Sequence, residues 1–244
     1  MLEESPVEPL DNRLLAARAR AEILKAVFDG RFEEKLPNED RLAEMLGVSR
    51  TTVRSALQGL ERDCIVTRRR AIGTIINRHI SRSSLALQRL AGFDWMLEER
   101  GHEVTVDVTT AWRTAGDDVP SHAGLEPGEE HLRIDKSYRA DGELAITIED
   151  YVPAAQLLVA EAPAVAPPSL FTFAEEHCRS AIHHAVVTII PQVKHGDSTR
   201  LEIDEGAPFI RLAETHYSAK GDVVACSLID FNDEFIRLEV VRTQ

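Results

Sequence analysis

Basic side chains are concentrated between residues 48 and 82, where the sequence holds eight arginines against two acidic residues. Arg50 and Arg54 are four residues apart, so on a helix they lie on one face. A guanidinium group can bind both acceptors of a guanine edge, and the hydroxyls of Thr51 and Thr52 can hold phosphate oxygens. These residue types at this spacing favour a DNA-binding surface. The alternative is the solvated polar face of an ordinary helical hairpin.

Two short helices must position these side chains. Apolar residues recur at gaps of three and four through residues 42–48 and again through residues 53–60, which predicts one buried face on each helix. Gly47 lies between them, where a tight turn needs a residue that accepts positive φ. We expect Asn38 and Ser49 to cap the two helices, because their side-chain oxygens can accept hydrogen bonds from free backbone N–H groups.

A basic hairpin is expected after the second helix. Residues 65–67 and 74–76 are mostly β-branched, which predicts two short strands. Arg68, Arg69 and Arg70 follow the first strand, and three arginines at a loop tip suit a minor groove or a phosphate backbone. Two helices followed by a hairpin predict a winged helix-turn-helix, whose second helix enters the major groove.

Residues 36–76 closely resemble the DNA-binding domain of the GntR family of regulators. The shared residues are Leu36, Pro37, Glu39, Leu42–Glu44, Leu46–Arg54 and Gly73–Thr74. The resemblance and the residue types together predict DNA contacts at Asn38, Arg50, Thr51, Thr52, Arg54, Arg68, Arg69, Arg70 and Gly73. Two positions where the family has arginine are Asp40 and Ile72 here. We therefore expect an operator preference that differs from the family norm.

Charge divides the chain into two parts. The whole sequence of 244 residues carries a net charge of −13. Residues 1–82 hold 15 basic and 13 acidic residues, whereas the rest holds 13 and 28. The basic charge is therefore focused on the predicted reading helix and wing, as phosphate contact requires. The acidic remainder would be repelled by DNA, so we expect it to form a separate domain that faces away from it.

Other compositional features exclude several classes of protein. Cys64, Cys178 and Cys226 are widely spaced and show no metal-ligand spacing, which favours free thiols in a reducing cytoplasm, without metal or cofactor. The first ten residues are acidic and contain proline, unlike a signal peptide. No apolar run is long enough to cross a membrane. We expect a cytoplasmic protein without membrane contact.

The second half of the sequence alternates between strand and helix patterns. We expect helices at residues 12–28, 87–100 and 170–178, and a small helix or turn at residues 117–124. The expected strands are at residues 103–112, 131–139, 144–152, 185–190, 209–218 and 223–231. Residues 160–168 are expected to form a loop. The segments 125–134 and 203–212 repeat an apolar–Gly–Arg pattern at identical spacing. They predict one mixed sheet built from two similar halves with a cleft at the joint, although a repeat this short can also arise by chance.

Residues 88–244 resemble the UTRA effector domain, which marks the HutC branch of GntR regulators. Its anchors are the Leu90–Phe93 opening, the two repeated segments, Tyr151–Pro153 and the tail from Phe231 to Val240. The resemblance implies that this domain has the fold of chorismate lyase. It also implies that the domain binds a small metabolite, and that this binding releases the regulator from DNA. The predicted fold class is therefore α+β. The expected domains are a tail at 1–10, a winged helix-turn-helix at 11–78, a linker at 79–87 and the effector domain at 88–244.

The family pattern also implies where an effector would bind. The candidate residues are Gly92, Phe93, Lys136, Tyr138, Glu149, Ser169, His184 and Phe231. Relatives that bind amino-sugar phosphates carry arginines at the positions of Lys136 and Tyr138, so one cation is kept and one is lost. The family glutamate is Ile148 here, and the neighbouring Glu149 belongs to the opposite face of a strand. These departures disfavour a sugar phosphate, and Lys136 with His184 suggests a small organic acid. Each of these residues could equally be a packing residue.

The leading hypothesis is a homodimeric repressor that binds a palindromic double-stranded operator and responds to a small-molecule effector. One alternative is a ligand-independent DNA-binding factor with a degenerate pocket. The other alternative is an enzyme of the lyase type, but fold alone does not carry function. No catalytic triad, metal cluster or phosphate-binding loop stands out in the sequence.

Overall fold

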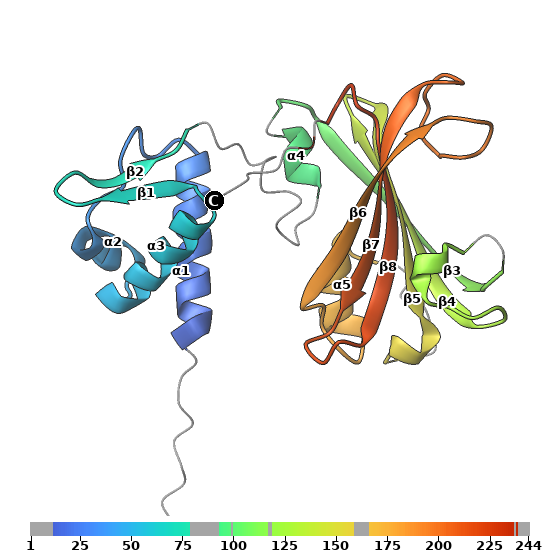
Figure 1. The fold of residues 1–244 in the computed structure, drawn as a ribbon, viewed down its shortest axis with the longest axis horizontal. Coiled ribbons are helices and arrows are strands. Elements are labelled where there is room, and N and C mark those ends of the chain that lie inside the picture. Colours follow the sequence, from blue (N-terminus) through green and yellow to red (C-terminus); the bar gives the residue numbers. More distant parts are fainter. Residues whose placement is uncertain are drawn as a thin grey trace, which may run out of the picture. The chain divides into compact units, whose positions relative to one another are not determined.

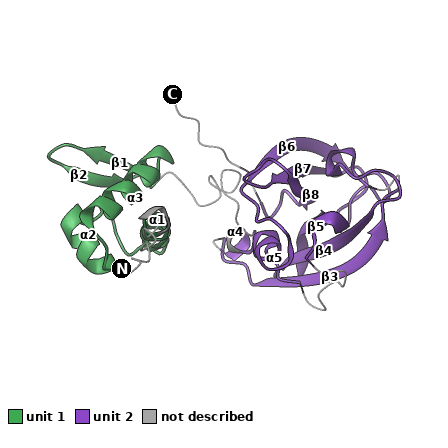
Figure 2. Ribbon diagram, turned by 90° about the horizontal axis from the view of Figure 1, so that it is seen from below, with its two compact units in different colours: residues 1–85, 240–244 green, residues 86–239 purple. Residues whose placement is uncertain are grey.

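The computed structural model describes residues 12–78, 93–98, 100–116, 119–158, 166–236 and 238. The chain divides into two compact units, residues 1–85 with 240–244 and residues 86–239 (Figure 2). The predicted linker at 79–87 and the tail at 1–10 lie entirely outside the described residues, as does most of the expected loop at 160–168.

The described residues of the first unit form three helices and a two-stranded antiparallel sheet (Figure 1). The elements are α1 (Asn12–Phe28), α2 (Glu39–Leu46), α3 (Arg50–Arg62), β1 (Val66–Arg69) and β2 (Gly73–Ile76). The predicted apolar stripes meet in one core. Its buried members from the helices include Ile23, Leu42, Val53, Leu57 and Leu60. This arrangement is the predicted winged helix-turn-helix.

Local sequence signals set the ends of the two short helices, as predicted. The side chain of Asn38 accepts the backbone N–H of Arg41, and that of Ser49 accepts the backbone N–H of Thr52. Gly47 ends α2 in the left-handed conformation with φ of 64°, which glycine adopts without steric cost. Short-range hydrogen bonds therefore fix where the reading helix α3 begins.

The wing differs in one respect from the prediction. Arg68 and Arg69 lie within strand β1, where Arg68 pairs with Thr74. The turn is made by Arg70, Ala71 and Ile72, and Ala71 has a positive φ of 66°. The placement of all three arginines at the loop tip was therefore wrong, because the register of the hairpin carries the strand two residues further than the β-branched run suggests.

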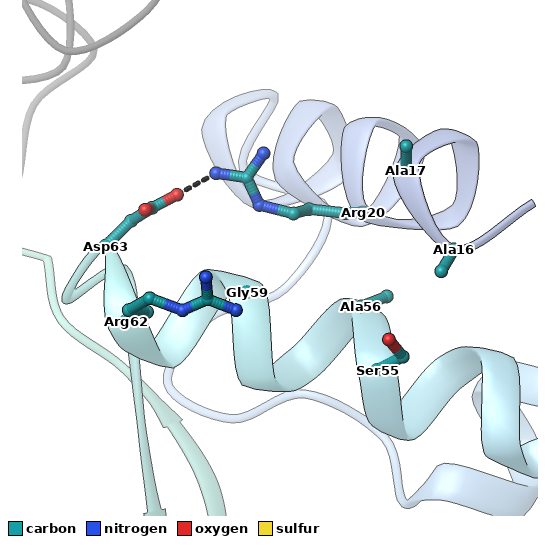
Figure 3. A pocket seen from close by; sticks show the side chains of 8 residues that line it. All are labelled: Ala16, Ala17, Arg20, Ser55, Ala56, Gly59, Arg62 and Asp63. Atoms are coloured by element: carbon teal, nitrogen blue, oxygen red, sulfur yellow. Dashed lines mark hydrogen bonds and ion pairs between the residues drawn. The ribbon is translucent and has the colours of Figure 1, made fainter. Parts of the chain in front are cut away.

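Helix α1 packs closely against α3. A Cβ atom at Gly59 would lie 2.8 Å from Cδ of Arg20, so glycine allows the arginine to cross α3. Arg20 then forms an ion pair with Asp63 just beyond the end of that helix (Figure 3). A hollow of about 320 Å³ lies between the two helices beside this pair and is lined largely by small side chains. The hollow therefore follows from the way α1 and α3 pack, with small side chains between them and Arg20 crossing α3 at Gly59.

Within its described residues, the second unit is built on one six-stranded sheet (Figure 1). All of its strand pairs are antiparallel, so the expectation of a mixed sheet was wrong. The strand order is β3-β4-β5-β8-β7-β6, so β3 and β6 are the edges. The strands are β3 (Val104–Thr114), β4 (Glu130–Ala140), β5 (Glu143–Pro153), β6 (His184–Val193), β7 (Pro208–Tyr217) and β8 (Val223–Phe231). The helical elements are α4 (Asp94–Glu98), η2 (Ser121–Ala123), η3 (Ala154–Gln156) and α5 (Leu170–His177). The α+β class is confirmed.

The sheet consists of two equivalent halves, in agreement with the internal repeat. The hairpin β4-β5 and the hairpin β7-β8 lie side by side, joined through β5 and β8. Arg133 on β4 and Arg211 on β7 hold corresponding positions. Glu149 pairs with Leu228 at the junction, and the two halves are arranged about this pair as about an approximate twofold axis.

One face of the sheet, called the inner face here, is covered by α4 and α5. Met96 and Leu97 of α4 pack with Tyr138, Ile148 and Phe231 in one apolar cluster. Helix α5 contributes Leu170, Phe173 and Ala174 to a second cluster, with Leu132, Ile134 and Val152 of the sheet. Of the helix expected at 87–100, the described part is helical from Asp94 to Glu98. The space between the two apolar clusters holds the polar residues described below.

Candidate nucleic-acid interface and effector site

Glu39 links the arginines of the reading helix to the wing. Its two carboxylate oxygens lie 2.8 Å from Nη2 of Arg54 and 2.8 Å from Nη2 of Arg68. Nη2 of Arg50 is 3.9 Å away, and Nε of Arg50 lies 2.9 Å from the carboxylate of Asp40. The hydrogen bond from Arg54 lowers the pKa of Glu39. Three arginines from two elements are therefore gathered at one carboxylate.

The geometry suits contact with DNA. The side chains of Arg50 and Arg54 are 59% and 53% exposed, whereas that of Glu39 is 18% exposed. The carboxylate therefore lies beneath the guanidinium groups and orients them toward solvent. Exposed ion pairs contribute little to folding stability, so these pairs are best explained as positioning contacts. Glu39 and Asp40 were absent from the predicted site, although the aligned family motif contains the glutamate.

The other predicted DNA contacts lie around these arginines. Asn38 and Thr52 are engaged at the helix starts, since Asn38 caps α2 and the hydroxyl of Thr52 lies 2.8 Å from that of Ser49. Thr51 is exposed on the first turn of α3. Arg69, Arg70 and Gly73 are exposed on the wing. The structure thus brings the predicted residues to adjoining positions on α2, α3 and the wing.

A buried polar network, called the inner-face cluster here, lies between the two apolar clusters of the second unit. Nζ of Lys136 is 2.6 Å from Oδ2 of Asp150. The hydroxyl of Ser227 donates to Oδ1 of Asp150 at 2.5 Å and lies 3.0 Å from Nε2 of His216. The same Nε2 is 3.5 Å from Oε2 of Glu214. Four strands, β4, β5, β8 and β7, each supply at least one member.

Burial determines the charge state of this cluster. Lys136, Asp150, Ser227 and His216 are each at most 2% exposed, and Glu214 is 9% exposed. Burial lowers the pKa of His216 to about 4, so the imidazole is neutral at neutral pH. Burial and the nearby Asp150 raise the pKa of Glu214 to about 7. The cluster therefore combines a Lys136–Asp150 ion pair, a neutral imidazole and a carboxyl group whose pKa is raised to about 7.

Hydrogen bonding leaves one nitrogen of this cluster without a partner. Ser227 has a single proton and donates it to Asp150, so Nε2 of the neutral His216 must be the donor toward Ser227. Nδ1 of His216 is then an acceptor, and among the described residues it has no hydrogen-bond partner. Buried polar atoms are nearly always satisfied in folded proteins. This nitrogen is thus set up to accept a hydrogen bond from a group outside the described residues.

The structure separates the predicted effector residues into distinct places. Lys136, Tyr138 and Phe231 share the inner face, where Phe231 stacks edge-on against Phe93 at 5.3 Å. Burial raises the pKa of Tyr138, and its ring belongs to the apolar core. Ser169 caps α5 by accepting the backbone N–H of Thr172.

Two predicted effector residues lie away from the inner face. Glu149 forms an ion pair with Arg133 at 2.8 Å and accepts a hydrogen bond from the hydroxyl group of Tyr151. These three side chains lie on the opposite face of the sheet. His184 is exposed and stacks on Tyr217 at 5.3 Å, also on the opposite face. Gly92 lies outside the described residues.

Sequence reasoning missed the partners of Lys136 as site residues. In their strands, polar residues share the buried phase with apolar ones. These polar residues are Asp150, Ser227, Glu214 and His216. A charged residue in the buried phase of a strand is therefore the signal that could have found them. The pairing of β5 with β8, which brings them together, could not be read from local sequence.

The described residues contain no group of three or more His, Cys, Asp or Glu side chains that could hold a metal ion. No helix in that part of the chain is long and apolar enough to cross a membrane.

A winged helix-turn-helix with an exposed basic reading helix, linked to a sheet domain, defines a DNA-binding transcriptional regulator of two parts. Comparison with protein families agrees with this class. Residues 15–76 match the bacterial regulatory proteins of the gntR family, and residues 99–234 match the UTRA domain. The chain is therefore a GntR-family transcriptional regulator with a UTRA domain.

Curated relatives include similar regulators. The chain is 32% identical over 147 residues to the HTH-type transcriptional regulator GgaR of Escherichia coli strain K12, covering 59% of this chain and 58% of GgaR. It is 29% identical over 143 residues to the uncharacterized HTH-type transcriptional regulator RB1450 of Rhizobium meliloti, covering 58% and 57%. The chain thus matches somewhat more than half the length of these relatives.

Solved structures share the fold. The protein YydK of Bacillus subtilis matches with a TM-score of 0.68 and 17% identity, covering 94% of this chain and 99% of YydK. PhnF of Mycobacterium smegmatis matches with a TM-score of 0.50 and 20% identity, covering 92% and 99%. Because the sequence identities are this low, the similarity to these structures establishes the fold alone.

Proposed function

We propose that this protein is a homodimeric repressor whose operator binding is modulated by a small-molecule effector held at the inner-face cluster. The observation that carries the proposal is the cluster itself. Five polar side chains replace apolar packing between two hydrophobic clusters, and one imidazole nitrogen has no hydrogen-bond partner among the residues that the structure describes. Buried ionic groups are weak stabilisers of a fold, so a binding role accounts for them better than a structural one.

The chemistry of the cluster favours an effector that donates hydrogen bonds. Nδ1 of His216 offers a lone pair, and Glu214 offers a carboxyl group whose neighbour His216, 3.5 Å away, is neutral at neutral pH. A hydroxyl or ammonium group can satisfy both, whereas a carboxylate or a fully ionised phosphate group has no proton to donate to the imidazole. The organic acid predicted from the sequence depended on two free cations. Lys136 is instead paired with Asp150, and His184 lies on the opposite face.

The proposed DNA contacts are the exposed arginines of α3 and the wing. Arg50 and Arg54 would enter the major groove, and Arg69 and Arg70 would approach the backbone or minor groove. A dimer would present two reading helices to the two half-sites of a palindromic operator. Effector binding would change operator affinity only if the effector favours one arrangement of the two units over another.

The test is fluorescence anisotropy of the full chain on DNA from upstream of its own gene, with scrambled DNA as control. Uncharged polyols, amines, organic acids and sugar phosphates are then added separately. We expect a hydroxyl-bearing or amine compound to release the operator. The variant His216→Gln should bind the operator normally but lose the response, whereas His184→Gln should keep it.

Two results would count against this proposal. A His216→Gln variant that responds like the wild type would remove the cluster from effector binding. Specific operator binding that no compound changes would favour the alternative of a ligand-independent DNA-binding factor.

A further inference from the structure

Asp40 is an acidic residue among the exposed arginines of the DNA-binding unit. It lies in the first turn of α2, and its carboxylate is 2.9 Å from Nε of Arg50, the first residue of the reading helix α3. The side chains of Asp40 and Arg50 are 60% and 59% exposed, whereas that of Glu39 is 18% exposed. Asp40 therefore reaches the surface beside Arg50 instead of lying beneath it, as Glu39 does.

The stability of α2 does not account for this side chain. Asn38 already caps the helix by accepting the backbone N–H of Arg41, and Glu39 already places a negative charge in the first turn. An exposed ion pair such as that of Asp40 with Arg50 contributes little to folding. On a surface that meets phosphate groups, an exposed carboxylate also costs affinity unless it accepts a hydrogen bond there. A donor on the DNA therefore explains Asp40 better than folding does.

The base edges of the major groove differ in what they offer to a carboxylate. Cytosine presents an amino group, which is a donor, whereas guanine presents acceptors alone. Adenine presents an amino group beside the acceptor N7. A carboxylate is acceptor-only and repels such lone pairs. Cytosine is therefore the base that fits Asp40 best, and guanine is the base that fits it worst.

The ion pair with Arg50 determines where this cytosine would lie. The first residues of a recognition helix contact base edges, and arginine binds guanine through two parallel hydrogen bonds. The contact with Asp40 uses Nε of Arg50, so the terminal nitrogens of the guanidinium group can still bind a guanine. Successive base pairs are about 3.4 Å apart along the helix axis. A carboxylate 2.9 Å from Nε of Arg50 is therefore within reach of the next base pair.

We infer that Asp40 is a specificity-determining residue, which accepts a hydrogen bond from the amino group of a cytosine next to the guanine bound by Arg50. This inference rests on the operator binding in the proposed function and specifies one further base pair of the operator. A carboxylate has about four lone-pair sites, so Asp40 can hold Arg50 and bind the cytosine at the same time. The two side chains then read neighbouring base pairs as a unit.

The test is the selection of bound sites from randomised double-stranded DNA by the full chain and by variants at residue 40. The wild type should select cytosine at one position of the recognition sequence. Asp40→Asn should select adenine at that position, because an amide binds N6 and N7 together, and Asp40→Arg should select guanine. In anisotropy titrations, each variant should bind its own preferred site roughly five- to a hundredfold more tightly than the wild-type site.

Two further variants serve as controls. Glu44→Arg makes the same change of charge as Asp40→Arg at another exposed position of α2, where Glu44 pairs with Arg41 at 3.0 Å. It should leave the selected sequence unchanged. Arg50→Ala should relax the preference for guanine at the position next to the cytosine. Thermal unfolding followed by circular dichroism would verify that each variant is folded.

The possible results separate this inference from the proposed function. A folded Asp40→Arg variant that selects the same sequence as the wild type would overturn the inference while leaving specific operator binding intact. The same change of sequence in Glu44→Arg as in Asp40→Arg would also overturn it, since the effect would then be one of net charge. A wild type that selects no sequence at all would overturn the proposed function together with this inference.

Discussion

The buried pair of Lys136 and Asp150 leads to the sharpest prediction. The two side chains are 2% and 1% exposed and 2.6 Å apart, so Lys136→Met leaves a carboxylate buried without its cation. Removing one partner of a buried pair costs about 3–5 kcal/mol. For a domain of this size, that corresponds to a fall in Tm of roughly 6–20 °C. The double variant with Asp150→Leu removes both charges and should recover most of the stability.

Urea denaturation followed by circular dichroism and tryptophan fluorescence would measure this cycle. The control is Arg139→Met, which breaks the exposed pair of Arg139 with Glu202 at 2.9 Å and should change stability little. A loss below about 1 kcal/mol for Lys136→Met would show that the pair is open to water. Strictly additive losses in the double variant would refute the reasoning that the two charges stabilise each other.

Three further predictions concern the reading helix and the inner-face cluster. Arg54→Ala should weaken operator binding by roughly ten- to a hundredfold and relax base preference, whereas Arg41→Ala, which removes an exposed arginine of α2, should not; equal effects in anisotropy titrations would contradict the assignment. Burial raises the pKa of Glu214 from 4.5 to about 7, so the folded state favours the protonated carboxyl group. The stability that this group contributes is fully present below pH 4.5 and is lost as the pH rises through 7. Relative to Glu214→Gln, the free energy of unfolding of the wild type should therefore fall by about 3 kcal/mol between pH 4.5 and pH 7. If urea denaturation gave both proteins the same dependence of stability on pH, the burial of the carboxyl group would be contradicted. Ser49→Ala removes the cap of α3 and should cost about 1 kcal/mol; an unchanged Tm of the first unit would show that the cap is not needed.

Local signals explain why so much of the fold could be predicted from the sequence. Asn38, Gly47 and Ser49 act through hydrogen bonds and backbone angles within a few residues, so the two helices begin and end as predicted. The turn at Asp141 and Gly142 is equally local, because both residues have positive φ. The wing register was not predicted, because Arg68 joins the strand through contacts with Glu39 and Thr74 rather than through its own propensity.

The site was harder to predict because long-range pairing assembles it. Lys136 was identified by resemblance, but Asp150 reaches Ser227 and His216 only through the order of β5, β8 and β7. His184 was assigned to the effector by resemblance to the family pattern, but it stacks on Tyr217 on the opposite face of the sheet. An edge strand that exposes apolar residues on both faces lacks the alternation that would reveal which way each side chain points.

The approximate twofold axis of the sheet has a consequence for how a molecule could be held there. Lys136 on β4 and Glu214 on β7 occupy corresponding places in the two repeats, as Tyr138 and His216 do. An exact duplicate would present the same group on both sides and could not tell one end of a bound molecule from the other. Here a paired ammonium and a phenol ring face a carboxyl group and an imidazole. The two halves therefore share the backbone symmetry but carry different side chains at corresponding positions. An asymmetric molecule bound across the axis would have one preferred orientation.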